Sequence, residues 1–518
     1  MSASTERKNR AAAREAGTDK KTLARQEAEK TAARSRRRWT IGSILVAILL
    51  IVMLLTNSSF FFRHTTALSV GERKYSPAEL SYTYLSQYSN FLSQYGSYAS
   101  LLGLDTSGGV RSLASQSCPM LEEGKTWRDY FLQLAEDSLS QSSVLTRYAA
   151  DNGIELDKAD LAEIDRDLSS LEEAAKAYGF SSVNRFLSAQ YGRGVNARLA
   201  RSMMQENALA SKALKAYSDA LPFSREQLDD YYASLEGDSD YFDYAVFSVQ
   251  AASVPAEGED AQDAPNDETR LEARMTAQAI EMAYKDGYDI EDCVERLNAA
   301  IEAEYDASSA TVRSGVSGGS LGDPGEWLKD SARKAGDVGV IEASDGSGYT
   351  VAVFLAREDN HYPTVSVRHI LIKAVASEDG TYSDEAKAAA LAKINEIKAE
   401  YEAGEQTEES FAALAEKYSE DNGSNLRGGL YEDIYKGEMV QEFNDFCFGG
   451  HKSGDVGVVY GESSGYAGYH LVFFVGEGEL YSDLIAHDGL ASPLVNDFLA
   501  EQTEGAEPVL HYWAKLVG

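Results

Sequence analysis

The sequence predicts a multidomain protein in which a single N-terminal transmembrane helix precedes an all-α domain and two α+β domains of similar design. Three observations support this prediction. Residues 39–62 carry no charge, residues 71–235 place apolar side chains at helical spacing, and one pattern of strands and helices occurs twice between residues 236 and 480. A chain of 518 residues has room for such an arrangement.

Charge divides the chain into a basic N-terminal tail and an acidic remainder. Residues 1–38 hold twelve Lys and Arg against five acids, yet the whole chain has a net charge of −35. Binding to nucleic-acid phosphates needs a basic surface. The sequence therefore predicts that the protein is no general nucleic-acid binder, and we interpret the acidity as a solubility feature.

Residues 39–62 form the predicted transmembrane signal-anchor. Ile41–Leu55 is almost wholly aliphatic, and about 20 apolar residues suffice to cross the hydrocarbon core as a helix. The arginines before this segment hold the tail, residues 1–38, in the cytoplasm by the positive-inside rule. Because Thr56-Asn57-Ser58 is a poor signal-peptidase site, we expect an uncleaved, single-pass cell-membrane protein with most of its chain extracytoplasmic.

Residues 63–235 form the predicted all-α domain. Ser76 followed by Pro77 is a typical helix start. The helix that follows carries an apolar stripe at three- and four-residue spacing, made of Leu80, Tyr84, Tyr88, Phe91 and Tyr95. Further helices are expected at about 126–151, 157–178, 181–191, 194–220 and 224–235. We interpret the tyrosine-rich stripe as core, with a surface for unfolded chains as the alternative.

Residues 236–362 and 363–480 form the predicted pair of α+β domains. Residues 334–355 and 452–475 both contain Gly-Asp-Val-Gly, a short β-branched run, a glycine-rich loop and a strand. Upstream, each copy has a strand, an acidic loop and a helix. The first of these helices is expected to face the core through Leu271, Met275, Ala279 and Met282. Residues 481–518 are expected to supply a helix at 493–501 and a strand that pack back on the helical domain.

The second α+β domain, within residues 364–480, contains several linked motifs. These are Arg368-His369-Ile370-Leu371-Ile372-Lys373, then Tyr418-Ser419-Glu420-Asp421, Arg427-Gly428-Gly429-Leu430, Gly454-Asp455-Val456 and Gly468-Tyr469-His470. In this order they resemble the motifs of the parvulin family of peptidyl-prolyl isomerases. With the anchor and the helical domain before it, the chain resembles the PrsA- and SurA-like foldases, which act outside the cytoplasm.

The resemblance implies an active site in this domain. It assigns catalytic roles to His369, Asp421 and His470 and a proline-binding wall to Leu430, Met439, Phe443 and Phe448. Rotation about a prolyl bond breaks no bond, so the reaction needs a pocket that favours the twisted amide rather than a nucleophile. No metal and no cofactor are therefore expected.

The first α+β domain is interpreted as a degenerate parvulin-like copy. Alignment of the strands sets Tyr244 or Ala245 against His369, and Thr350 against His470. Because both histidines are missing, we expect this copy to be inactive and to serve client binding or spacing. The three cysteines of the chain are widely spaced and follow no zinc-ligand pattern, so we expect them to be buried apolar side chains.

The predicted function is isomerisation of X-Pro bonds in unfolded or newly translocated polypeptides, by a protein with one membrane helix that also has the potential to form a homodimer. The alternative is a non-catalytic holdase that binds unfolded secreted clients through the helical and parvulin-like domains. A surface receptor or scaffold is a third reading. Gly461-Glu-Ser-Ser-Gly465 fits the hydrolase pattern G-x-S-x-G, but that motif requires a strand-to-helix elbow, whereas here it joins two strands.

Overall fold

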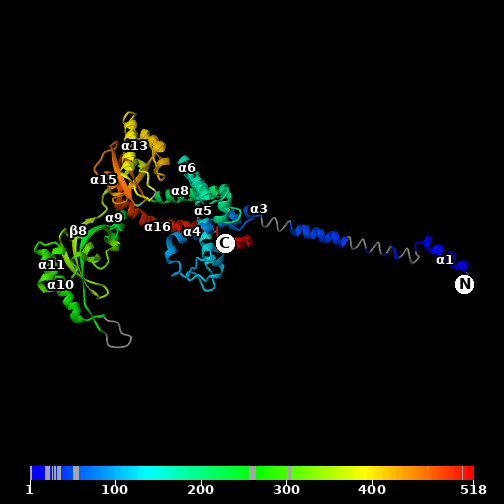
Figure 1. Ribbon diagram of the computed structural model, residues 1–518, viewed down its shortest axis with the longest axis horizontal. Helices are drawn as coiled ribbons and strands as arrows, with labels where there is room; N and C mark the ends of the chain where they lie inside the picture. The colour runs from blue at the N-terminus through cyan, green and yellow to red at the C-terminus, as the bar shows by residue number, and fades with distance from the viewer. Residues whose placement is uncertain are drawn as a thin grey trace. The chain divides into compact units, whose positions relative to one another are not determined.

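The computed structural model of the protein describes residues 3–17, 24–25, 27, 31, 37–50, 58–255, 264–301, 305–377, 379–463, 465–504 and 506–517 (Figure 1). The chain divides into two compact units, one of residues 1–214 with 499–518 and one of residues 215–498. The division falls inside two long helices, α8 (Ala197–Asp219) and α16 (Tyr481–Thr503).

The N-terminal segment is helical where it is described, in α1 (Ala3–Glu15) and in residues 37–50. Among the described residues, no helix combines the length and the apolar character that crossing a bilayer requires. Residues 51–57 of the predicted anchor lie outside the described residues. Beyond them, Ser58 caps the short helix α3 (Ser59–His64), which buries Phe62 in the core of the first unit.

Helices around an aromatic core build most of the first unit. After α3 come α4 (Pro77–Tyr95), α5 (Trp127–Asn152), α6 (Lys158–Ala177), α7 (Val183–Gln190) and α8, with 3-10 turns at Gly96–Tyr98 and Val110–Ser115. Ser76 caps α4 as expected, because its hydroxyl accepts from the N–H of Glu79 while the Glu79 carboxylate accepts from the N–H of Ser76. The ring of Phe91 packs on those of Trp127 and Phe131. The helical character of this region is confirmed.

The first unit also contains a small sheet, so the expectation of an all-α domain is wrong. Three antiparallel strands pair in the order β13-β1-β2, namely β1 (Leu68–Val70), β2 (Arg73–Tyr75) and β13 (Pro508–Leu510). The guanidinium of Arg128 donates to the carbonyl oxygens of Ala514 at 3.2 Å and Val517 at 2.8 Å, in and after the last 3-10 turn (Tyr512–Leu516). Strands of three residues are too short to show a period of two in the sequence.

Helix α16 begins at Tyr481, directly after strand β12 (Tyr466–Leu480), rather than near Pro493. The backbone N–H groups of Tyr481 and Ser482 donate to the carbonyls of Tyr362 and Asn360, at 2.9 and 3.0 Å. These bonds satisfy donors that the first turn of a helix leaves open. Pro493 therefore lies inside the helix, where it has no N–H and one intrahelical hydrogen bond is lost. We expected Pro493 in the first turn, where proline is commoner.

The second unit contains two four-stranded antiparallel sheets with the same topology (Figure 1). The first sheet has the order β6-β3-β8-β7, from β3 (Tyr241–Gln250), β6 (Thr311–Ser317), β7 (Val338–Glu342) and β8 (Gly348–Glu358). The second has the order β10-β9-β12-β11, from β9 (Pro363–Lys373), β10 (Leu430–Ile434), β11 (Val456–Ser463) and β12. The predicted pair of α+β domains is confirmed.

Helices occupy corresponding places in the two α+β domains. They are α10 (Asp267–Lys285), α11 (Ile290–Ile301) and α12 (Gly325–Lys329) in the first domain, and α13 (Asp384–Glu402), α14 (Glu408–Tyr418) and α15 (Gln441–Cys447) in the second. Helix α9 (Arg225–Ser234) precedes the first of these domains. Smaller elements are the pair β4 (Ser253–Val254) and β5 (Ala264–Pro265) and the 3-10 turns at 307–309, 318–320 and 425–427. All three cysteines are buried free thiols, as expected.

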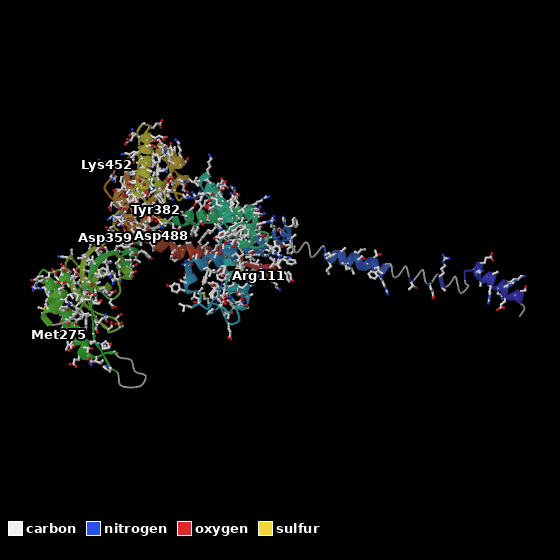
Figure 2. All side chains as sticks on the ribbon, viewed as in Figure 1. Arg111, Met275, Asp359, Tyr382, Lys452 and Asp488 are labelled. Atoms are coloured by element: carbon white, nitrogen blue, oxygen red, sulfur yellow. The ribbon has the colours of Figure 1, made fainter. Side chains whose placement is uncertain are left out.

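Helix α10 faces its sheet with a different stripe from the predicted one. Leu271, Met275 and Met282 are 56%, 62% and 67% exposed (Figure 2 labels Met275), whereas Ala273 and Ile280 are buried. Both stripes run at three- and four-residue spacing, so periodicity alone does not choose between them. The small side chains at 273 and 277 let the helix approach the sheet closely. The prediction is therefore wrong for Leu271, Met275 and Met282, whereas Ala279 packs against the core as expected.

Candidate active site

A pair of histidines lies on one face of the second sheet. His369 is on β9 and His470 on the neighbouring strand β12, where the register sets Val472 opposite His369 and Leu371 opposite His470. Residues two apart on a strand share a face, so the two histidines are diagonal neighbours on the same side. Their rings stack with centroids 5.3 Å apart and their Nδ1 atoms are 3.0 Å apart. Each of the two residues is only 4% exposed.

Asp421 lies beside the first histidine of this pair. Its Oδ2 is 2.9 Å from His369 Nε2, and it also accepts from the hydroxyls of Ser424 and, at 3.2 Å, Tyr431. Burial alone raises the pKa of Asp421, but the hydrogen bonds from His369 and Ser424 outweigh it and hold the pKa well below the usual range. The carboxylate is therefore ionised and acts only as an acceptor.

The second histidine is held neutral. Burial is the main cause, and together with the neighbouring His369 it lowers the pKa of His470 to about 3, although Asp421 opposes this shift. Its Nε2 is 3.1 Å from the hydroxyl of Tyr466. Gly461 on the next strand leaves the space for this contact, because a Cβ there would lie 2.9 Å from both His470 Nε2 and the Tyr466 oxygen.

The hydrogen bonds of these residues form a directed chain. Since the Asp421 carboxylate only accepts, His369 donates from Nε2, and in the neutral form of this ring Nδ1 is an acceptor. His470 then donates from Nδ1 to His369, which leaves His470 Nε2 to accept from Tyr466. With both imidazoles neutral, this set of bonds allows one tautomer and one orientation for each ring.

The loop after α14 carries the carboxylate to the sheet by pairing with β9. The N–H of Leu371 donates to the Ser419 hydroxyl at 3.1 Å, and the N–H of Glu420 donates to the Leu371 carbonyl at 2.8 Å. Further along, Gly429 accepts from the N–H of His369 at 2.8 Å. Gly429 has a φ of +71°, and a Cβ there would lie 2.2 Å from the His369 carbonyl oxygen, so this approach requires glycine.

Apolar side chains form a wall next to the histidines. The ring of Phe443 is edge-on to both imidazoles, with centroids 5.4 Å from His369 and 5.2 Å from His470. Met439 and Phe448 pack in the same cluster, and Phe448 also meets the ring of Tyr362 edge-on at 5.7 Å. Of the four predicted wall residues, the structure places these three on the histidine face.

The fourth predicted wall residue, Leu430, lies elsewhere. It pairs with Arg368, whose side chain is on the sheet face opposite to that of His369, whereas the next residue, Tyr431, pairs with Val367 on the histidine face. The ring of Tyr431 is 5.3 Å from that of His369. Tyr431 therefore takes the place expected for Leu430, because the turn through Gly429 sets the register of β10.

Sequence reasoning missed four residues of this site, namely Ser424, Tyr431, Gly461 and Tyr466. Ser424 and Tyr431 follow the Tyr-Ser-x-Asp motif within a few residues, and their hydroxyls suit a buried carboxylate. Tyr466 precedes His470 by four residues, a spacing that puts both side chains on the same face of a strand. Gly461 stands out in the sequence only as part of a hydrolase pattern, which the structure places across the β11–β12 hairpin.

The first α+β domain has no histidine at the position of His369. The valine of the Gly-Asp-Val-Gly motif gives a common reference point in the two sheets. Across the neighbouring strand it lines up with Ala245 on β3 in the first sheet and with Arg368 on β9 in the second. One residue further along, Val246 corresponds to His369. The alignment of Tyr244 or Ala245 with this histidine is therefore wrong by one or two residues, because β-strand residues near a register shift carry no sequence marker.

Thr350 takes the place of His470, as predicted, since Thr350 pairs with Ile341 as His470 pairs with Val459. The carboxylate that follows α11, Asp306, accepts from the N–H and hydroxyl of Ser308 in its own turn. Within the described part of the first α+β domain, the hydrogen-bonded network of the second has no counterpart. Among the described residues of the whole chain, no three His, Cys, Asp or Glu side chains cluster closely enough to hold a metal ion.

Residues 349–475 match the family model described as the PPIC-type PPIASE domain. The match begins in β8 of the first α+β domain and runs into β12 of the second. With its sheet and its buried histidine pair, this part of the chain is a parvulin-type peptidyl-prolyl isomerase domain.

Curated relatives of this region are foldases. Foldase protein PrsA 4 of Bacillus cereus is 33% identical over 123 residues, which cover 24% of this chain and 35% of the relative. Foldase protein PrsA 3 of Bacillus anthracis is 32% identical over 126 residues, which cover 24% and 35%. The chain thus spans about a third of the length of these relatives.

Two solved structures of PrsA are similar to this chain. The structure of the peptidylprolyl isomerase PrsA from Bacillus cereus is 28% identical, covers 29% of this chain and 50% of that one, and has a TM-score of 0.18. The structure of PrsA from Bacillus subtilis is 14% identical, covers 86% of this chain and 92% of that one, and has a TM-score of 0.21.

Proposed function

We propose that the protein is a membrane-anchored, extracytoplasmic foldase that accelerates cis–trans isomerisation of X-Pro bonds in newly translocated polypeptides. The observation that carries this proposal is the buried chain of hydrogen bonds through His470, His369 and Asp421 inside a parvulin-type domain. The extracytoplasmic location is supported by the basic tail, residues 1–38, and the uncharged run that follows it.

Prolyl isomerisation requires a pocket of suitable shape and polarity and no nucleophile. Rotation of a prolyl bond passes a barrier of about 18–20 kcal/mol because the planar amide loses its resonance. The twisted amide has less charge separation, so an apolar wall such as Phe443 and Met439 favours it over the planar form. Catalysis in this scheme is differential binding of the twisted state, without a covalent intermediate.

The hydrogen-bonded chain supplies orientation. Asp421 fixes the tautomer of His369, which fixes that of His470, and the hydroxyl of Tyr466 ends the chain. The Tyr466 side chain is half-buried, whereas both histidines are almost fully enclosed. We therefore assign Asp421 and His369 positioning roles, and we place the substrate amide near Tyr466 and the apolar wall.

The test is a protease-coupled isomerisation assay with a chromogenic X-Pro tetrapeptide and the full chain. We expect acceleration by the wild type and a fall of about tenfold or more in kcat/KM for Asp421→Asn, an isosteric change that frees the tautomer of His369. Thr350→Ala is the matched control, because it alters the position of His470 in the first copy. If the wild type gives no acceleration, the isomerase proposal is wrong.

The second candidate function is that of a non-catalytic holdase for unfolded secreted clients. It is favoured by the exposed stripe of Leu271, Met275 and Met282 on α10, since flexible methionines adapt to varied apolar partners. A double variant, His369→Ala with His470→Ala, that still suppresses aggregation of a reduced test protein supports a holdase role. We also include a homodimer in the proposal, to be tested by light scattering of the full chain.

A further inference from the structure

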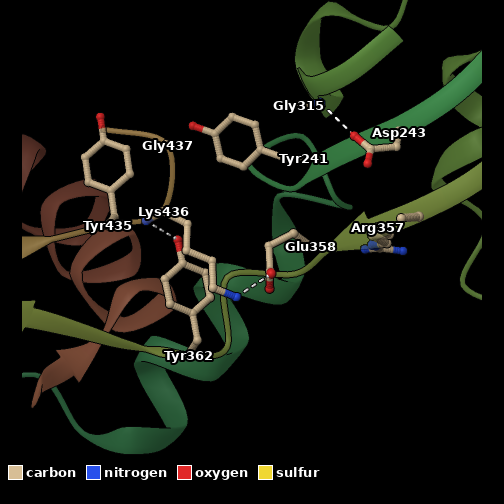
Figure 3. A pocket seen from close by; sticks show the side chains of 10 residues that line it. Tyr241, Asp243, Gly315, Arg357, Glu358, Tyr362, Tyr435, Lys436 and Gly437 are labelled. Atoms are coloured by element: carbon tan, nitrogen blue, oxygen red, sulfur yellow. Dashed lines mark hydrogen bonds and ion pairs between the residues drawn. The ribbon is translucent and has the colours of Figure 1, made fainter. Parts of the chain in front are cut away.

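A cavity separate from the histidine pair lies at the junction of the two α+β domains. Its volume is about 500 Å³, and both domains line it (Figure 3). The first domain contributes Tyr241 at the start of β3, Asp243 and, at its end, Tyr362, and the second contributes the loop from Tyr435 to Gly437. Figure 3 shows the phenol of Tyr241 reaching toward the side of the cavity that carries Tyr435.

The tyrosine walls are held in place by neighbouring contacts. The ring of Tyr435 stacks on that of Tyr481 with centroids 4.4 Å apart and planes 3° apart, and Tyr481 in turn packs against Tyr362 at 5.9 Å. Lys436 links the two domains, because its Nζ lies 4.0 Å above the Tyr362 ring and 2.6 Å from the carboxylate of Glu358. Aromatic surfaces are therefore presented in a fixed arrangement.

The charged residues that line the cavity already have partners. Arg357 pairs with the buried Asp240, Glu358 pairs with Lys436, and Asp243 accepts from the N–H of Gly315 at 2.8 Å. An ionic ligand would have to displace one of these pairs. The cavity offers tyrosine rings instead. Their hydroxyls add donors, since the Tyr362 oxygen accepts from the N–H of Lys436 at 3.0 Å and its own proton is still available. Such a lining suits a ligand with an apolar body and hydrogen-bond acceptors.

A proline-containing strand of polypeptide has this chemistry. In the polyproline II conformation the backbone makes no internal hydrogen bonds, so its carbonyls point outward as acceptors. The proline rings stack on aromatic side chains. Because the conformation is already formed before binding, such segments bind aromatic-lined grooves at low entropic cost. The volume lies within the range of about 300–1,000 Å³ typical of ligand pockets. It admits a few residues of an extended chain and excludes a folded domain.

We propose that this junction cavity, lined by Tyr241, Tyr362 and Tyr435, is a second peptide site that binds an extended, proline-containing segment in the polyproline II conformation. That the segment belongs to a client rests on the proposed function. The loop that carries Tyr435 continues within a few residues to Met439 of the wall beside the histidines. Binding at the junction thus raises the effective concentration of neighbouring X-Pro bonds at that wall.

The experiment measures binding of fluorescein-labelled decaproline to the full chain by fluorescence anisotropy, with a Gly-Ser peptide of equal length as the control ligand. We expect saturable binding of decaproline and a rise in Kd of about tenfold or more for Tyr241→Ala, which removes one wall. Ala356→Trp is a second variant, because the exposed Ala356 lines the cavity and a large side chain there fills it without removing a wall.

Two further measurements separate this site from the histidine site. Asp421→Asn should bind decaproline as the wild type does, and Tyr241→Ala should isomerise the short tetrapeptide at the wild-type rate. The junction site is overturned if Tyr241→Ala and Ala356→Trp both bind decaproline with wild-type affinity. It is also overturned if only Asp421→Asn loses binding, or if the Gly-Ser peptide binds as well as decaproline. If isomerase activity is absent while decaproline binding keeps this dependence, the proposed function fails and the junction site stands.

Discussion

Gly461→Ala tests the geometry of the histidine chain without removing any group that takes part in it. Gly461 lies on β11 two residues after Val459, which pairs with His470, and an added Cβ would be 2.9 Å from His470 Nε2, 2.9 Å from the Tyr466 oxygen and 3.1 Å from a methyl of Val440. Ordinary contact needs roughly 3.5 Å. The imidazole or the phenol must therefore move by about half an ångström, and both belong to the 3.1 Å hydrogen bond that ends the chain.

Two energies follow from this displacement. Crowding of a packed interior costs about 1–3 kcal/mol, and loss of one neutral hydrogen bond costs about 1 kcal/mol. We expect the free energy of unfolding to fall by about 2–4 kcal/mol. If about 1.4 kcal/mol of the loss falls on the transition state, kcat/KM for X-Pro isomerisation falls about tenfold.

The assays are urea unfolding and the protease-coupled assay, run on Gly461→Ala and on Gly476→Ala. Gly476 is the matched control, because it lies on β12, the strand of His470, and an added Cβ there meets no atom within 4 Å. Its replacement is expected to leave both measurements close to those of the wild type. An unchanged kcat/KM in Gly461→Ala would refute the view that the position of His470 and Tyr466 sets the rate.

Three other predictions test the acid response, the C-terminal tail and the thiols. Because the pKa of His470 is about 3 in the folded protein and 6.5 for an unperturbed histidine, the unfolded chain binds an extra proton between these values, so stability rises with pH across this window by up to about 1.4 kcal/mol per pH unit; His470→Gln should flatten this slope in urea titrations at pH 4–7. Removal of residues 508–517 deletes β13 and the carbonyl acceptors of Arg128, and should lower the unfolding free energy of the first unit by about 3 kcal/mol, measured by circular dichroism in urea. Burial raises the pKa of Cys293 to about 11 and of Cys447 to about 12, so a chromogenic thiol reagent at pH 8 should label them only in denaturant, and rapid native labelling would contradict their enclosure.

Features with a local cause could be predicted from the sequence. The Ser76-Pro77 helix start depends on residues within one turn, and the structure shows the expected capping box. The two α+β domains were visible because Gly-Asp-Val-Gly marks the same β-strand entry twice. His369 and His470 are predicted as a pair only through the resemblance to the parvulin family, because nothing in their spacing of about a hundred residues shows that they meet.

Features that depend on register or on the choice between two faces could not be predicted. Leu430 and Tyr431 are adjacent, and only the pairing of β10 with β9 decides which of them faces the histidines. Helix α10 has two apolar stripes, and the small size of Ala273, rather than hydrophobicity, decides which stripe packs on the sheet. The contact between Gly461 and His470 is a property of packing between strands and leaves no local pattern in the sequence.

The two α+β domains show which parts of this fold are scaffold and which belong to the site. In both, a glycine after the Gly-Asp-Val entry makes room for an aromatic ring, Gly339 for Trp327 and Gly457 for Phe446. This contact closes the sheet against its short helix in the same way with and without histidines, so it belongs to the scaffold.

The histidines have a different dependence on their surroundings. A buried imidazole pair costs free energy unless each nitrogen has a partner, and in the second domain Asp421 provides the final acceptor. In the first domain Val246 needs no partner, and Asp306 serves its own turn. His369, His470 and Asp421 are therefore physically interdependent, since removing the carboxylate would leave the enclosed Nε2 donor of His369 with only the neutral Ser424 hydroxyl, at 3.1 Å, as an acceptor. Within its described residues, the first domain has none of the three groups at these positions, so its fold does not bear the free-energy cost of burying imidazoles.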